Sequence, residues 1–133
     1  MEDLIRETSI QTPAIHFCAT TGLMEIKGRS IPDNPEEFWA DILTWFDKYI
    51  ITPKPETLFR IDLEYFNISS SKRILFLLYK LNEIVEKGYK EKVEWFYREA
   101  DEDMFEVGQD YAFMVKVPFE FKEYNDQDMA LAI

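Results

Sequence analysis

The sequence is poor in the residues that build disulfide frameworks and metal centres. It holds a single cysteine, Cys18, and a single histidine, His16, so an internal disulfide and a zinc site with several histidines are both excluded. Long apolar runs are also missing: the longest, residues 74–79, is far shorter than the roughly 20 residues of a membrane-spanning helix. The N-terminus, Met1-Glu2-Asp3, lacks the basic start of a signal peptide. We therefore expect a cytoplasmic protein without a membrane span.

Basic residues are scarce as well, with 15 Lys and Arg against 26 Asp and Glu and a formal charge of -11. No segment gathers cations into a stripe that could neutralise several phosphates, which argues against nucleic acid and anionic membranes as partners. Apolar residues make up 47% and aromatic residues 16% of the 133 residues, which is enough for one self-sufficient core. We expect one domain over residues 1–133, with its core at about 12–124 between a polar leader and a polar tail.

Hydrophobic periodicity predicts alternating strands and helices. Period-two alternation indicates a hairpin over residues 14–28 and strands near 59–65, 93–98 and 118–124. A stripe at three- and four-residue steps indicates a helix that begins at the Asn34-Pro35-Glu36-Glu37 cap and ends before Pro53. A second helix is expected over 69–86, ending at Lys87-Gly88, and a short acid-led helix carries residues 104–111.

This order favours an α/β fold, with a mixed sheet of about five strands and helices packed mainly on one face. Parallel crossovers bring the ends of successive strands to one edge of a sheet. We therefore expect residues 28–34, 66–72 and 99–103 to converge at one end of the molecule. The middle segment is the most informative of the three.

The second helix starts with charges opposite to those of the other two. Helix N-termini favour acids, because their unpaired N–H groups leave a positive potential there. This helix instead opens with Asn67, Ile68, Ser69, Ser70 and Ser71, followed by Lys72 and Arg73. The pattern fits a phosphate, either from a bound ligand or attached to a serine. The simpler interpretation is that Asn67 or Ser69 caps the helix and the two cations point into water.

Three motifs, at 25–34, at 63–67 with 69–72, and at 101–104, resemble the SiaC family of bacterial regulatory phosphoproteins, whose members look like STAS domains of anti-sigma-factor antagonists. The resemblance implies partner switching. A Ser/Thr kinase of the anti-sigma-factor type phosphorylates the protein, and a PP2C-type phosphatase reverses the modification. The unmodified form binds a target, which in the namesake system is a diguanylate cyclase that controls cyclic-di-GMP and biofilm formation. The resemblance implies a regulator and not an enzyme.

One departure from the family affects the expected phosphoacceptor. The family commonly carries a phosphorylated threonine directly after the asparagine, where this chain has Ile68, which has no hydroxyl. We predict Ser69 as the acceptor and Ser70 as the second choice; the alternative is a scaffold that is not phosphorylated. Asn67, Ser71, Lys72 and Arg29 are the expected neighbours of this switch site. A small phosphometabolite-binding protein or enzyme using the same helix start is a further alternative.

Other candidates carry less weight. Phe66 and Phe96 fall out of phase with the buried residues of their strands, so we expect them to be possible partner contacts. The acids at 99–103 match no calcium loop. His16 and Cys18 lack a third group that would orient a nucleophile. We expect no catalytic residue, metal or cofactor.

Overall fold

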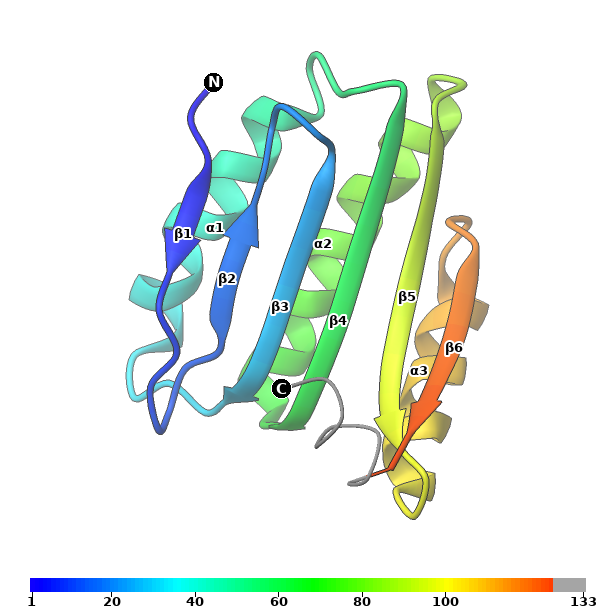
Figure 1. The fold of residues 1–133 in the computed structure, drawn as a ribbon. Coiled ribbons are helices and arrows are strands. Elements are labelled where there is room, and N and C mark those ends of the chain that lie inside the picture. Colours follow the sequence, from blue (N-terminus) through cyan, green and yellow to red (C-terminus); the bar gives the residue numbers. More distant parts are fainter. Residues whose placement is uncertain (126–133) are drawn as a thin grey trace.

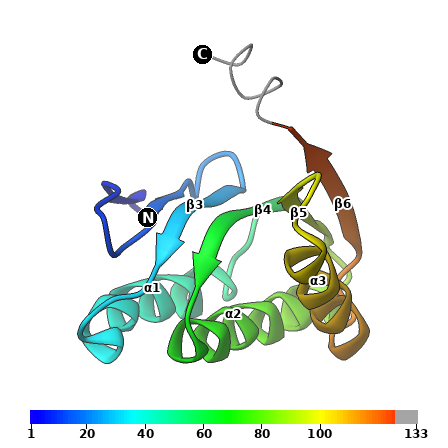
Figure 2. The same ribbon diagram turned by 90° about the horizontal axis from the view of Figure 1, so that it is seen from below.

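The computed structural model describes residues 1–125. Its strands are β1 (Leu4–Arg6), β2 (Ala14–Phe17), β3 (Leu23–Ser30), β4 (Glu56–Phe66), β5 (Lys90–Arg98) and β6 (Phe119–Tyr124), and its helices are α1 (Pro35–Tyr49), α2 (Ile68–Glu86) and α3 (Glu102–Met114). The strands form one six-stranded sheet in chain order, antiparallel from β1 to β3 and parallel from β3 to β6 (Figure 1). The helices cover one face (Figure 2), which confirms the predicted mixed sheet.

The sixth strand, β1, lies in the segment that the sequence marks as a polar leader. It pairs with β2 in the register Leu4↔Phe17, and of its three residues only Leu4 is buried. Because a single buried residue gives no periodic pattern, hydrophobic periodicity does not predict this strand. The leader is tied down further by the indole of Trp45, which donates a hydrogen bond to the Glu2 carbonyl at 2.8 Å.

Helix starts follow the capping chemistry of the sequence. The Asn34 side chain accepts a hydrogen bond from the Glu37 N–H at 3.2 Å, and Pro35 occupies the first turn of α1. Asp101 caps α3 in the same way, accepting from the Met104 N–H at 3.0 Å. Both helices carry acids in the first turn, as the helix dipole favours. The predicted cap of α1 is confirmed.

The end of α2 depends on the one glycine that follows it. Gly88 adopts φ +90°, and the N–H of Tyr89 donates back to the Ile84 carbonyl at 3.3 Å. A residue with a side chain would be strained at this φ. The left-handed helix ending expected at Lys87-Gly88 is therefore present, and it turns the chain directly into β5.

The core between sheet and helices is aromatic, and one part of it is unusually close-packed. Trp95 on β5 is fully buried and donates a hydrogen bond from its indole to the Met104 carbonyl at 3.0 Å. Gly108 of α3 lies against this ring, so that a Cβ there would fall 2.6 Å from the indole. Absence of a side chain at position 108 is what lets α3 approach β5.

The other face of the sheet carries charged side chains of both signs. Arg60 of β4 donates to Glu94 of β5 at 2.8 Å, and Lys92 reaches Glu120 of β6 at 2.7 Å. These pairs match the solvated surface expected for a sheet with helices on one side only. Across residues 1–125, none of the helices combines the length and the apolar character that crossing a membrane requires.

Candidate functional site

The end of β3 and the start of α2 meet through buried hydrogen bonds. The Asn67 N–H donates to the Ser30 carbonyl at 3.1 Å. The hydroxyl of Ser70 donates to the same carbonyl at 3.0 Å and lies 2.7 Å from the Ser30 hydroxyl. Both serines are fully buried. The parallel crossover thus brings two of the three expected segments together at the carboxyl end of the strands.

The three serines of α2 are in three different environments. Ser69 is partly exposed, and its hydroxyl donates to the Asn67 side-chain oxygen at 3.0 Å. The same oxygen also accepts from the Ser70 N–H at 2.9 Å, so Asn67 is the N-cap of α2. Ser71 lies 2.8 Å from the hydroxyl of Tyr111, which donates to the Ser71 carbonyl at 2.9 Å. The start of α2 is therefore fastened to β3 on one side and to α3 on the other.

These environments alter the order of the candidate acceptors. The Ser70 hydroxyl has no exposed surface and is used in the contact with Ser30, so a kinase active site cannot reach it in this conformation. Ser70 therefore anchors the helix, and Ser69 remains the proposed acceptor. Burial raises the pKa of Tyr111, which keeps its hydroxyl protonated as the donor to Ser71. Ser69 and Ser71 are both partly exposed, and Ser69 is the one whose hydroxyl bonds only within its own turn, because the Ser71 hydroxyl contacts Tyr111 of α3.

The electrostatic setting matches the sequence pattern, with one added contact. The first turn of α2 holds no acid, and Lys72 and Arg29 are both exposed. The guanidinium that touches this turn is that of Arg73, which donates to the Ser69 carbonyl at 3.2 Å. The four-residue spacing of Ser69 and Arg73 in a helix is the signal that could have placed Arg73 in the site.

Ile68 is the most exposed residue of this turn. Its side chain is 87% exposed, although it is a large aliphatic group. Position 68, where the resemblance described above leads to the expectation of a threonine, thus points into solvent.

The two phenylalanines expected as partner contacts lie on opposite faces of the sheet. A β-bulge between Gly28 and Arg29 shifts the phase of the strand pair, so Phe66 returns to the helix-covered face and meets Trp95 edge-to-face at 6.3 Å. Phe96 follows Trp95 and faces the opposite side of the sheet, beside Lys122. Both rings are partly buried. Phe66 therefore packs against the core, whereas Phe96 stays a predicted partner contact on the open face of the sheet.

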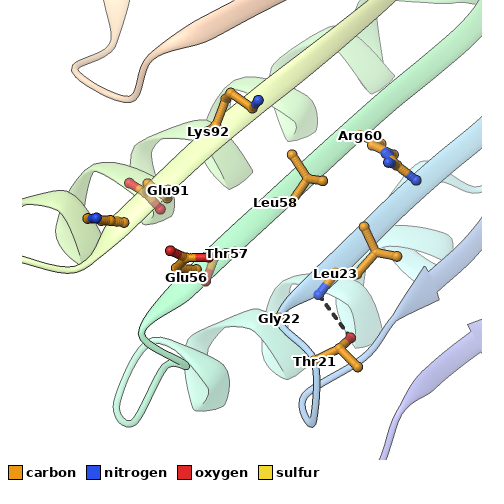
Figure 3. Close-up of a pocket in the computed structure, with 10 residues that line it drawn as sticks. Thr21, Gly22, Leu23, Glu56, Thr57, Leu58, Arg60, Glu91 and Lys92 are labelled. Carbon is orange, nitrogen blue, oxygen red and sulfur yellow. Dashed lines mark hydrogen bonds between the residues drawn. The ribbon is translucent and has the colours of Figure 1, made fainter.

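A cavity of about 460 Å³ lies at the other end of the sheet, over the starts of β3, β4 and β5 (Figure 3). Leu23 and Leu58, neighbours in register, line it together with Arg60 and Lys92. Both cations already contact carboxylates on adjacent strands. The cavity is separated from Ser69 by nearly the whole length of β4, so it is not part of the switch site.

Glu91, at the border of this cavity, is a buried carboxyl group without a hydrogen-bond partner of normal geometry among residues 1–125. Desolvation raises its pKa from 4.5 to about 8, and a weaker interaction with the Val85 backbone lowers it only in part. The carboxyl group is therefore mostly protonated at neutral pH.

We predict that Glu91→Gln makes stability less dependent on pH. The folded-state pKa lies above the unfolded one, so the proton on Glu91 stabilises the fold fully below pH 4.5, and this stability is lost as pH rises towards about 8. The neutral amide avoids the loss. The full pKa shift would correspond to more than about 4 kcal/mol, and because solvent partly screens the carboxyl group we expect the variant to exceed wild type by about 2 kcal/mol at pH 8 while matching it at pH 4. Urea unfolding at both pH values measures this. A constant difference between the two proteins would contradict it.

The remaining chemical candidates are dispersed. Among residues 1–125, no three or more His, Cys, Asp or Glu side chains gather in a group that could hold a metal ion. The His16 ring lies 3.4 Å from the Asp3 carboxylate at the exposed face of β2, and Cys18 lies beyond the end of that strand. The group of hydroxyls and cations at the start of α2 is thus the strongest candidate for a functional site among the described residues.

The fold and this site define a mixed α/β protein with a polar, cation-flanked helix start. Comparison with known proteins agrees with that class: the sequence profile of the SiaC family regulatory phosphoproteins matches residues 5–124. The chain belongs to the SiaC family.

Individual relatives are distant in sequence and close in fold. An uncharacterized protein of Pseudomonas aeruginosa strain UCBPP-PA14 is 24% identical over 126 residues, covering 95% of this chain and all of its own length. SiaC of Pseudomonas aeruginosa superposes with a TM-score of 0.85 at 23% identity, over 93% of this chain and 100% of its own. The structure of the diguanylate cyclase SiaD in complex with its activator SiaC from that organism matches with a TM-score of 0.87 at 24% identity, over 92% of this chain and 100% of the matched one.

Proposed function

We propose that this protein is the switchable binding component of a partner-switching pathway, and that the charge state of Ser69 gates its binding to a target. The observation that carries the proposal is the start of α2, where the partly exposed Ser69, whose backbone carbonyl accepts a hydrogen bond from Arg73, lies in a first turn without acids. A phosphoserine brings a charge of roughly -1.5 to -2 and three acceptor oxygens, which a helix N-terminus accommodates. The modification therefore requires little rearrangement of this protein.

The gate acts through the partner surface. Asn67, Ser70 and Ser71 fasten the helix start to β3 and α3, so that the turn stays in place when Ser69 changes charge. A partner shaped to the neutral serine and the apolar Ile68 would have to desolvate the phosphate without a matching cation. Burying an unpaired charge costs several kcal/mol, which is enough to release a partner.

The proposed partners follow from the family. They are a Ser/Thr kinase of the anti-sigma-factor type, a PP2C-type phosphatase and, as the target, a diguanylate cyclase like the one that SiaC accompanies in Pseudomonas aeruginosa. On this proposal the protein works in the cytoplasm, where these enzymes have ATP and GTP. It contributes a binding surface and leaves catalysis to its partners.

Phosphate mapping tests the proposal directly. Incubating the full chain with its cognate kinase and ATP should place one phosphate on Ser69, and Ser69→Ala should abolish the modification. The matched control is Ser71→Ala, which removes a neighbouring hydroxyl and should leave the phosphate on Ser69. Mass spectrometry of the digested protein identifies the residue. An unmodified protein after exhaustive incubation would contradict the proposal.

A second candidate has an observation of its own. Ile68 occupies the most exposed position of the turn and cannot accept phosphate. If that position is the one presented to the kinase, the protein is a constitutive scaffold. Ile68→Thr separates the two: a scaffold that lost its acceptor would gain phosphate at residue 68, whereas the Ser69 switch would already be phosphorylated without the change.

A further inference from the structure

The strand at one rim of the sheet, β6, has an outer edge with which no strand pairs among residues 1–125 (Figure 1). The Pro118 carbonyl accepts from the Val93 N–H at 2.9 Å, and the Tyr124 carbonyl likewise accepts from β5's neighbour Glu99 at 2.8 Å. Even-numbered residues thus direct their backbone groups to β5. The N–H and C=O groups that point outward therefore belong to Phe119, Phe121 and Glu123. Such a row of unpaired groups is a template for a further strand.

Two side chains of opposite charge, Glu120 and Lys122, lie on the open face of this strand and contact each other. On the side towards β5, Lys92 donates to Glu120 at 2.7 Å, and Lys122 lies 3.7 Å from Glu94. The side chains of Glu120 and Lys122 nevertheless stay 42% and 40% exposed, so both can contact a strand laid against the outer edge. A lysine on an edge strand commonly prevents pairing, but here a glutamate two positions earlier can face it.

A second copy of β6, running antiparallel about a two-fold axis at Phe121, matches this edge in both backbone and charge. Phe121 then pairs with its own copy and Phe119 with Glu123, so the outward backbone groups meet at hydrogen-bonded positions. Glu120 of each copy faces Lys122 of the other at the intervening positions, where side chains lie closest. Opposite charges placed directly across two strands stabilise their pairing.

The same charges disfavour the other registers. Moving the axis by one residue, to position 120 or 122, keeps the backbone bonds but places two glutamates or two lysines opposite each other, which is destabilising. The strand at the other rim, β1, offers only three residues. We propose that β6 is a homodimer surface, on which two copies of this chain pair antiparallel about Phe121 and join their sheets into one. This contact is distinct from Ser69 and does not depend on the phosphorylation proposal.

Concentration-dependent association of the full chain tests the pairing. The strand has six residues and each chain carries a formal charge of -11, so the contact is small and works against a general repulsion. We therefore expect a weak dimer, with a dissociation constant of roughly 10–100 µM. Sedimentation equilibrium up to about 1 mM measures it, and the amide signals of β6 in NMR spectra should shift with concentration. A protein that stays monomeric at the upper concentration would overturn the proposal.

Charge-reversed variants test the register. Glu120→Lys places lysines opposite lysines, and Lys122→Glu places glutamates opposite glutamates, so each variant alone should self-associate at least about ten-fold more weakly than wild type. An equimolar mixture of the two should regain a dimer, because every lysine of one chain then faces a glutamate of the other. Unchanged self-association of either variant, or a mixture that stays monomeric, would contradict the proposed pairing.

Two further variants test the backbone contact and the choice of rim. Glu123→Pro removes an N–H that points outward, which an edge strand tolerates, and should weaken the dimer at least about ten-fold. Ile5→Ser changes a side chain of β1 that is 57% exposed at the opposite rim and should dimerise like wild type. Thermal unfolding checks that each variant is folded. A dimer that survives Glu123→Pro and is lost in Ile5→Ser would assign the contact to β1 instead.

Discussion

Ser69→Asp should weaken binding to the target by at least about 30-fold, equivalent to about 2 kcal/mol, because the carboxylate places an unpaired charge in the interface. The same change should leave the fold intact, since Ser69 is partly exposed and an acid suits the first turn of a helix. The variant is therefore expected to melt at or slightly above the wild-type temperature while binding poorly. Calorimetric titration and thermal unfolding measure the two quantities.

Ser69→Ala is the matched control for charge. It removes the hydroxyl and its bond to Asn67 without adding charge, so the target should bind within about three-fold of wild type. If alanine and aspartate weaken binding equally, the effect comes from the lost hydrogen bond and the charge gate is wrong. If neither weakens it, Ser69 lies outside the interface.

Gly108→Ala should destabilise the protein by about 2–3 kcal/mol, opposite in sign to the usual effect of this substitution in a helix. Alanine is favoured over glycine in a helix interior by about 1 kcal/mol. Here, however, the added methyl would lie 2.6 Å from the ring of Trp95 and 2.9 Å from Phe121, both in packed surroundings. The helix would have to move off the sheet. The free-energy cost of this overpacking exceeds the gain from the higher helix propensity of alanine. Urea unfolding of the two proteins measures the difference.

Gln109→Ala is the control on the neighbouring position. Gln109 is exposed, so its change to alanine should shift stability by at most about 0.5 kcal/mol. A stabilised Gly108→Ala protein would mean that α3 does not pack against Trp95 as closely as described. The account of how α3 is seated would then be wrong.

Local chemistry made much of the fold predictable from sequence. Asn34-Pro35 identifies the start of α1 because its capping bonds involve residues three apart, and Gly88 identifies the end of α2 because only glycine adopts that φ readily. The alternation of β4 gives its buried face directly. Each of these signals depends on a few consecutive residues.

Features that depend on pairing were not predictable. The bulge beside Gly28 arises from the register of β3 against β4, and it reverses the face expected for Phe66. The burial of Ser70 requires the Ser30 hydroxyl, 40 positions earlier in the chain. Sequence patterns therefore located the run of serines but could not say which side chain is buried. The contact of Arg73 with Ser69, by contrast, has the four-residue spacing of a helix, which the sequence itself contains.

The most direct test of the switch is the affinity of the phosphorylated protein itself. Full-length protein carrying phosphoserine at position 69, prepared by the kinase or by genetic encoding, would be titrated against the same diguanylate cyclase as the unmodified form. We predict binding at least 30-fold weaker for the phosphoprotein, restored when a PP2C phosphatase removes the phosphate. Equal affinities for the two forms would contradict the gating of this protein at the start of α2.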